Sequence, residues 1–385
     1  RYSSLNPLIV HADGHSFDDT LSIASHIPLP PSVRRLATRY QGLPGKGSAL
    51  RVIFEIASRL QARALLLIEA DVISLEEHWI PLLLDPILAN ELDVVLPIYQ
   101  LVRPSLASAD LIVHPVISAM YHLPLRYPTG GEVAMAGGVA AFFAEHDVWE
   151  TDVARDGIDI WMVLEVALEE GRMGQVHLGP KIHRSNESTS MTEAKFLQEI
   201  GTLFRMALLH EKSWRQSEPT LPLTPTLTTP STLVVQSREG LPDPLQLWRN
   251  GKRAMRERVL KQWQSIMSQS HLAQIEALLE QPDESPQFDE VLWARLIYDF
   301  IVVYNLGEGD PDKVITSLYP LFLLRHAALL AQSIEAEDPE AAREALIQRQ
   351  CALFQEELEY LFQRWSGYVS PEQIELWREL GILPN

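Results

Sequence analysis

Short apolar runs alternate with helical patterns through the first half of the chain. Residues 8–10, 64–68 and 93–99 are apolar enough for buried strands, whereas residues 48–60 and 75–88 carry apolar positions at helical spacing. Strands that alternate with helices form mostly parallel sheets, because a crossover helix returns the chain to the same end of the sheet. The pattern therefore predicts an α/β fold with ligands beyond the carboxyl ends of the strands.

The second half of the chain is nearly all helical in pattern. Before it, residues 218–231 contain four prolines and five threonines, which is typical of a linker or of a strap on the surface. Amphipathic patterns follow at residues 245–279, 288–304, 314–336 and 339–365. We therefore predict an α/β domain over residues 1–213, a linker over 214–244 and an α-helical domain over 245–385. We expect the helical domain to pack on the α/β domain or to build a homo-oligomer.

Charge and composition then narrow the classes of function. The chain of 385 residues has a formal net charge of −19, which disfavours binding to nucleic acid or to an anionic membrane through the overall field. The one cysteine, Cys351, leaves no partner for an internal disulfide and fits a reducing compartment. Arg325 and His326 interrupt the longest apolar stretch, which falls short of the roughly 18 residues of a membrane span. We expect a cytoplasmic protein with no membrane span.

Two carboxylates follow the apolar run at residues 64–68. Glu69 and Asp71 are two residues apart, so in an extended strand both side chains share one face. Their mutual repulsion is relieved by a divalent cation or by a hydrogen-bonded sugar. The pair predicts a site for a metal-bound diphosphate or, equally, a solvated strand end that caps the next helix.

A glycine-rich segment, QGLPGKGSAL at residues 41–50, leads into the helical pattern at residues 48–60. It is not a Walker loop, because Lys46 is followed by Gly47 and not by Ser or Thr. Gly45 and Gly47 still permit a close backbone approach, and Lys46 offers a point charge for a phosphate. A simple turn that opens a helix is the alternative interpretation.

Other polar residues stand where the predicted strands and helices begin or end. Asp13 follows the first strand, where it suits a contact to a base or ribose, and Asp159 lies in the first turn of a predicted helix. A carboxylate there commonly complements the helix dipole, although it also suits a reacting sugar. His183 ends an alternating segment and is either a metal ligand or a structural histidine. Two adjacent glycines, Gly130 and Gly131, stand in the segment YPTGGEVAM at residues 127–135. They suit a backbone that runs beside a ligand.

Taken in order, these segments resemble the retaining GT-A glycosyltransferases that make glycerate-linked sugars. The similarity includes mannosylglycerate synthase, glucosylglycerate synthase and glucosyl-3-phosphoglycerate synthase. It is carried by DGHS, PGKGSAL, EADVIS, PTGGEVA, GIDIWM and HLGPKIHR, which follow the family order at similar spacing over residues 8–208. The resemblance implies a Rossmann-like GT-A domain that binds a nucleotide-diphosphate sugar, a GDP- or UDP-hexose, with Mg²⁺ or Mn²⁺.

The resemblance also implies roles for single residues. Asp71, the last acid of the DxD-type motif, and His183 would ligate the metal, while Glu69 stands where the family usually has Asp and would reach toward the ribose. Asp159 matches the acidic position near the anomeric carbon and the acceptor. The remaining expected contacts to the donor are those of Asp13, Lys46, Thr129, Gly130 and Gly131.

The acceptor loop and the start of the chain depart from the family pattern. Ala107 and Ala109 stand where phosphoglycerate-using members carry Arg and Thr, so we expect D-glycerate or a similar small acceptor and the synthesis of a compatible solute. The polar candidates that remain in this loop are Arg103, Ser105, Ser108 and Asp110. An N-terminal βα unit of the family is expected to precede Leu8. The alternatives are an enzyme with a phosphorylated acceptor, a non-catalytic family member and a nucleotidyltransferase.

Overall fold

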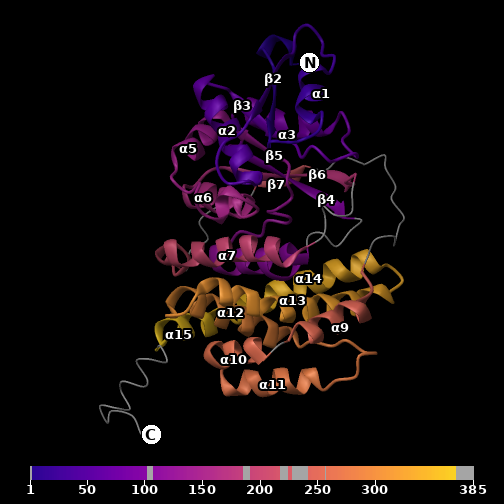
Figure 1. The fold of residues 1–385 in the computed structure, drawn as a ribbon, viewed down its shortest axis with the longest axis vertical. Coiled ribbons are helices and arrows are strands. Elements are labelled where there is room, and N and C mark those ends of the chain that lie inside the picture. Colours follow the sequence, from indigo (N-terminus) through magenta and orange to yellow (C-terminus); the bar gives the residue numbers. More distant parts are fainter. Residues whose placement is uncertain are drawn as a thin grey trace.

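The computed structural model describes residues 2–101, 107–184, 191–216, 224–227, 242–255 and 257–369. Figure 1 shows two layers: the strands and their helices lie in one half of the molecule, and the orange and yellow C-terminal helices lie in the other. The predicted linker falls largely on residues 217–223 and 228–241, which are outside the described residues.

The strands form a two-stranded sheet and a five-stranded sheet. In the small sheet, β1 (Leu8–Asp13) pairs in parallel with β2 (Arg34–Arg39). The order of the large sheet is β3-β5-β4-β6-β7, with β3 at Ala64–Leu67, β5 at Val133–Ala136, β4 at Val94–Leu101, β6 at Met173–Lys181 and β7 at Thr224–Leu227. Only β5 among these five runs antiparallel to its neighbours. The predicted α/β class with a mostly parallel sheet is confirmed.

Alternate residues of the central strands enter two different cores. Val95, Ala134 and Val176 pack with Trp79 and Leu83 of α3 (Trp79–Leu88) on one face of the sheet. The neighbours of Val95 and Ala134 along their strands belong to a larger core on the other face, together with residues of α2 (Lys46–Arg59), α5 (Gly137–Glu145) and α6 (Ile158–Leu168). This division follows from the two-residue period of a strand. Helices on both faces leave the strand ends at the rim of the sheet available for a site.

Further elements accompany the strands and helices named above. α1 (Thr20–His26) lies beside β1 and β2, and a π-helix, η3 (Ala109–Val113), leads into α4 (His114–Tyr121). A 3₁₀ helix, η4 (Asp152–Ala154), precedes α6, while α7 (Glu193–Leu209) and α8 (Glu211–Trp214) follow β6. Another 3₁₀ helix, η1, spans Ser3–Leu5.

The C-terminal region is helical, with more breaks than the periodicity predicts. Residues 245–279 form three helices, α9 (Pro244–Ala254), α10 (Glu257–Ile266) and α11 (Gln269–Leu279), and residues 339–365 form two, α14 (Pro339–Glu356) and α15 (Leu358–Ser366). Between them lie α12 (Glu290–Leu306) and α13 (Pro311–Ile334). A polar cap explains one break, because the Ser268 side chain accepts a hydrogen bond from the backbone of His271.

One helix of this region is as long and apolar as a membrane span. By length and composition α13 qualifies, yet 78% of its most apolar window is buried inside the protein. Arg325 in its middle is fully buried, and its Nη2 donates to Gln350 Oε1 at 2.8 Å. These are features of a central helix packed among other helices.

A buried arginine joins the two layers. Arg126 lies between α4 and β5, and its guanidinium is 2.7 Å from Asp110 of η3 and 3.0 Å from Glu344 of α14. The Trp293 indole of α12 donates to Leu111 O at 2.9 Å in the same region. The helical layer therefore packs directly on the elements that follow β4.

Candidate functional site

The polar residues predicted from the sequence gather beyond the carboxyl ends of β3 and β6. A β-bridge joins Val72, after β3, to His183, after β6. The backbone of Ile73 donates to Ile182 O at 2.9 Å, and that of Arg184 donates to Asp71 O at 2.8 Å. These bonds fix the two segments side by side, as expected for ligand-binding residues of an α/β sheet.

Glu69, Asp71 and His183 form a cluster that fits a divalent cation. One ligand atom from each lies within 4.8 Å of the others, and Asp71 Oδ2 is 3.2 Å from His183 Nδ1. Carboxylate and imidazole groups suit Mg²⁺ or Mn²⁺. The two acids come together by a different route than expected, because β3 ends at Leu67 and both lie in the irregular segment that follows it. Strand alternation is therefore not what pairs them.

The glycines around Lys46 serve packing at the start of α2. A Cβ on Gly47 would lie 1.8 Å from Val153 O, and one on Gly45 would lie 2.6 Å from Ala154 O. The Gly47 backbone donates to Arg155 O at 3.2 Å. Only glycine permits this approach, which brings the first residue of α2 next to the segment that begins α6.

Lys46 bridges two of the predicted acids. Its Nζ lies 2.6 Å from Asp159 Oδ2 and 3.2 Å from Glu69 Oε1. Burial acts to lower the pKa of Lys46, but the two carboxylates outweigh burial and raise it. Lys46 is therefore a fixed positive charge at the site.

Asp159 is buried in the first turn of α6 and is only partly satisfied. Its Oδ2 accepts from Lys46, whereas its buried Oδ1 has no hydrogen-bond partner among the described residues. Burial raises the pKa of Asp159, although Lys46 opposes that shift. A buried carboxylate oxygen without a donor is suited to a ligand hydroxyl or to a developing positive charge.

The Thr129–Gly131 segment packs against Glu69. Gly131 has a φ of +93°, and a Cβ there would lie 2.4 Å from Glu69 Cδ. The hydroxyl of Thr129 is buried and has no hydrogen-bond partner among the described residues. The adjacent glycines therefore allow the backbone to run directly beside the acid cluster, and the predicted contact of this backbone to a ligand stays a prediction.

Lys181 and Glu132 belong to the site, although their roles were not predicted. The Lys181 Nζ lies 2.7 Å from Glu69 Oε2, 2.8 Å from Glu132 Oε2 and 2.6 Å from Gly130 O. Glu132 also accepts a hydrogen bond from the Tyr99 hydroxyl. Both residues lie inside the segments HLGPKIHR and PTGGEVA, and their separation of 49 positions hid the pairing.

Asp13 lies outside this network of contacts. Its carboxylate accepts from the Ser16 backbone at 3.0 Å and lies 3.6 Å from Arg39 Nε. The hydrogen bond from Ser16 is the largest cause that lowers the pKa of Asp13. The described contacts of Asp13 thus order the loop after β1, and its predicted contact to a base or ribose stays a prediction.

Two of the four polar candidates of the expected acceptor loop pair with other side chains, and the other two lie outside the described residues. Ser108 is buried and donates to Glu199 Oε2 of α7 at 2.7 Å, while Asp110 pairs with Arg126. Arg103 and Ser105 lie outside the described residues. Ala107 and Ala109 are buried and apolar.

Glu199 is a further carboxylate that the sequence did not indicate. Burial raises its pKa to about 7, and nearby Asp156 and Asp159 add to the shift while Ser108 opposes it. Ser108 and Glu199 are 91 positions apart, so no spacing in the sequence pointed to this pair.

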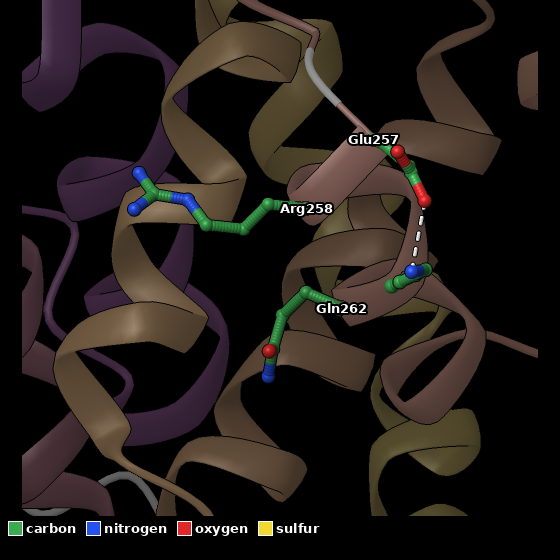
Figure 2. A pocket seen from close by; sticks show the side chains of 4 residues that line it. Glu257, Arg258 and Gln262 are labelled. Carbon is green, nitrogen blue, oxygen red and sulfur yellow. Dashed lines mark ion pairs between the residues drawn. The ribbon is translucent and has the colours of Figure 1, made fainter.

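A depression elsewhere on the surface has none of these features. Glu257, Arg258, Lys261 and Gln262 of α10 line it, and Figure 2 shows an ion pair across it. That pair, Glu257 with Lys261 at 2.8 Å, is one helical turn apart and largely exposed. Exposed pairs of this kind contribute little, so we assign no role to the depression.

Comparisons with known proteins identify no family for the chain. No protein-family model and no curated protein sequence matches it. Glucosyl-3-phosphoglycerate synthase from Mycobacterium tuberculosis, in complex with phosphoglyceric acid, aligns at 19% identity and a TM-score of 0.39 over 51% of this chain and 66% of that chain. The complex with Mn²⁺, uridine diphosphate and phosphoglyceric acid aligns at 20% identity and 0.38 over 51% and 66%.

A structure described as a mycobacterial protein aligns at 18% identity and a TM-score of 0.38, over 52% of this chain and 63% of that chain. The alignments thus span about half of this chain and less than two thirds of each solved chain. At such low TM-scores and identities, these likenesses carry no conclusion about function.

Proposed function

We propose that the chain is a metal-dependent, retaining GT-A glycosyltransferase that moves a hexose from a nucleotide-diphosphate sugar to D-glycerate or a similar small acceptor. The observation that carries the proposal is the convergence of Asp71 and His183 with Lys46, Asp159 and the Gly130–Gly131 backbone. These residues come from five separate segments of the sequence. Their order along the chain is that of the family it resembles.

In this proposal Asp71 and His183 hold the cation, and Lys46 supports the negative charge of the donor. A cation at this site supplies Lewis-acid neutralisation of the charge that develops on the leaving diphosphate. Lys46 adds a fixed charge that is already oriented by two carboxylates, so little reorganisation accompanies transfer. The Thr129–Gly131 backbone would line the pocket for the diphosphate and sugar.

Asp159 faces the reacting sugar in the same proposal. Its Oδ2 is held by Lys46, which leaves Oδ1 to orient the acceptor hydroxyl or to stabilise positive charge at the anomeric carbon. Attack on the face that the leaving group departs from retains the configuration, and no covalent bond to Asp159 is needed.

A metal-binding experiment tests the assignment. We expect Asp71→Asn or His183→Ala to weaken Mn²⁺ binding by at least about 100-fold, because each removes one protein ligand. Mn²⁺ bound to each folded variant is measured by electron paramagnetic resonance, with uridine diphosphate and guanosine diphosphate added in separate series. The exposed Glu257→Gln on α10 is the control. Parent-like Mn²⁺ binding by both site variants would show that the metal site is misassigned.

A transfer screen then defines the substrates. Glucose and mannose donors, as UDP and GDP derivatives, are tested against D-glycerate and 3-phosphoglycerate with Mg²⁺ or Mn²⁺. We expect preference for the unphosphorylated acceptor, because buried Ala107 and Ala109 offer no group that binds phosphate. Preference for 3-phosphoglycerate would favour an enzyme with a phosphorylated acceptor. The absence of both transfer and donor hydrolysis would favour a non-catalytic family member.

We also place the enzyme in the cytoplasm, where its one cysteine stays reduced. A homo-oligomer formed through the helical region is part of the same proposal. Sedimentation that gives only monomer would remove it.

A further inference from the structure

The Glu69 side chain is bound at both carboxylate oxygens by lysines. Lys46 Nζ lies 3.2 Å from Oε1, and Lys181 Nζ lies 2.7 Å from Oε2. The two lysines come from opposite sides of the site, one at the start of α2 and the other at the end of β6. Among the described residues, Glu69 is thus the one carboxylate that contacts both lysines.

Each lysine also holds a second part of the site. Lys46 contacts Asp159, and Lys181 binds Glu132 and the carbonyl of Gly130. The Glu69 backbone donates to Glu132 Oε1 at 3.3 Å, which closes a ring of contacts on that side. Through these bonds Glu69 connects the Gly130 backbone to Lys46, the lysine proposed to contact the donor.

The length of the glutamate side chain is what permits this bridge. An aspartate at position 69 would retract the carboxylate by about 1.5 Å, one carbon–carbon bond. Contacts now at 2.7 and 3.2 Å would then exceed hydrogen-bond length for at least one lysine. Glutamate at this position is therefore suited to the two lysines.

We propose that Glu69 is a positioning residue, which bridges Lys46 and Lys181 and thereby orients the donor-side lysine and the Gly130–Gly131 backbone, and is not a ligand of the cation or of the ribose. The inference rests on the proposed function of the site. Each Glu69 oxygen already faces an ammonium group, so a cation bound at the same oxygen would lie beside a like charge. Asp71 and His183 are then the protein ligands of the cation.

The Glu69→Gln variant separates the three roles available to this residue. We expect Mn²⁺ affinity to stay within about threefold of the parent, because no metal ligand is lost. Uridine diphosphate affinity in the presence of Mn²⁺ should be unchanged or higher by up to about tenfold, since the variant removes a negative charge beside the diphosphate site. Transfer should show kcat lowered by at least about tenfold with no rise in donor KM, because orientation is lost and binding is kept.

Each other role predicts a different result. A metal ligand would lose Mn²⁺ affinity by about tenfold or more, and a ribose ligand would lose uridine diphosphate affinity. Either outcome overturns the proposal. Glu69→Asp, which keeps the charge and loses the reach, should lower kcat as Glu69→Gln does, and full activity in Glu69→Asp would also overturn it.

Labelling of Lys46 tests the contact independently of any sugar transfer. Reductive methylation followed by peptide mass spectrometry should modify Lys46 at least about threefold faster in Glu69→Gln than in the parent, because the amide is uncharged and offers one oxygen to the two lysines. Lys252, paired with Asp283 at 2.9 Å in the helical region and similarly exposed, is the control lysine. Unchanged labelling of Lys46 would refute the bridge. If the parent binds no nucleotide and transfers no hexose, the proposed function fails, while Mn²⁺ affinity and Lys46 labelling still decide the role of Glu69.

Discussion

Two buried aspartates, one in each layer of the molecule, differ in how fully they are satisfied. Asp299 of α12 is fully buried and interacts with three side chains: His271 Nδ1 at 2.7 Å, the Tyr360 hydroxyl at 2.6 Å and Arg364 Nε at 3.0 Å. Asp159 of α6 is almost as buried, but only Lys46 binds it, and its Oδ1 has no hydrogen-bond partner among the described residues.

The difference separates a structural carboxylate from a functional one. The partners of Asp299 lie on α11 and α15, so this residue joins three helices and has both oxygens occupied. A buried polar atom with no partner costs stability, so its presence at Asp159 indicates a group that a ligand completes. Asp299 thus uses its buried carboxylate for packing between helices, whereas Asp159 keeps one buried oxygen available to a ligand.

The largest effect is expected at Asp299. Replacing it with Ala leaves Arg364 and His271 without their buried partner and should lower the free energy of unfolding by about 3–5 kcal/mol. Urea denaturation measures the loss, and Asp299→Asn gives a milder variant should the alanine form fail to fold. The Mn²⁺ affinity of the folded fraction should stay at the parent value. A loss below about 1 kcal/mol would show that this cluster is not what holds the three helices together.

Asp159→Asn should lower the rate of transfer and leave stability nearly unchanged, the opposite of what is expected for Asp299→Ala. We expect transfer to fall by at least about 100-fold, as for other groups that stabilise charge at a reacting centre. Stability should stay within about 1 kcal/mol of the parent, because losing the contact to Lys46 is offset by removing a buried charge whose pKa is raised by folding. Urea denaturation and transfer rates are measured in parallel for Asp159→Asn and Asp299→Ala. A large loss of stability with intact transfer would place Asp159 with Asp299 as a structural residue.

The sequence predicted the parts of the site that depend on local pattern. Apolar runs located β3 and β4, and helical spacing located α2. Lys46, Asp71, Asp159 and His183 were recognised because each lies in a short segment of fixed order, and the structure brings Lys46 to Asp159 and Asp71 to His183.

Contacts between distant segments were beyond such reasoning. Lys181 acquires its role only where the ends of β3 and β6 and the loop before β5 meet, and neither periodicity nor spacing describes that meeting. The same limit applies to Ser108 and Glu199. Helix breaks within residues 245–279 were missed because the apolar stripe continues through them, while a cap at Ser268 interrupts the backbone.

Glu199 shares features with both aspartates, and its substitution is expected to have the smallest effect. Its side chain is partly buried with one described donor, Ser108, and it lies near Asp156, Asp159 and Lys195. Burial raises its pKa from 4.5 to about 7, so between those values the folded state keeps a proton that the unfolded chain releases. Stability therefore declines as the pH rises through this window, and the full cost remains above about pH 7.

Glu199→Gln removes that cost while it keeps an acceptor for Ser108. We expect the variant to exceed the parent by about 2 kcal/mol in free energy of unfolding at pH 8, and to match it at about pH 4, where the parent carboxyl is protonated in both the folded and the unfolded state. Urea denaturation across this range, with the exposed Glu276→Gln on α11 as the control, measures the difference. A constant offset at all pH values would mean that Glu199 is ionised in the folded protein. It would then belong with Asp299, whose charge is satisfied, and not with Asp159, whose environment opposes ionisation.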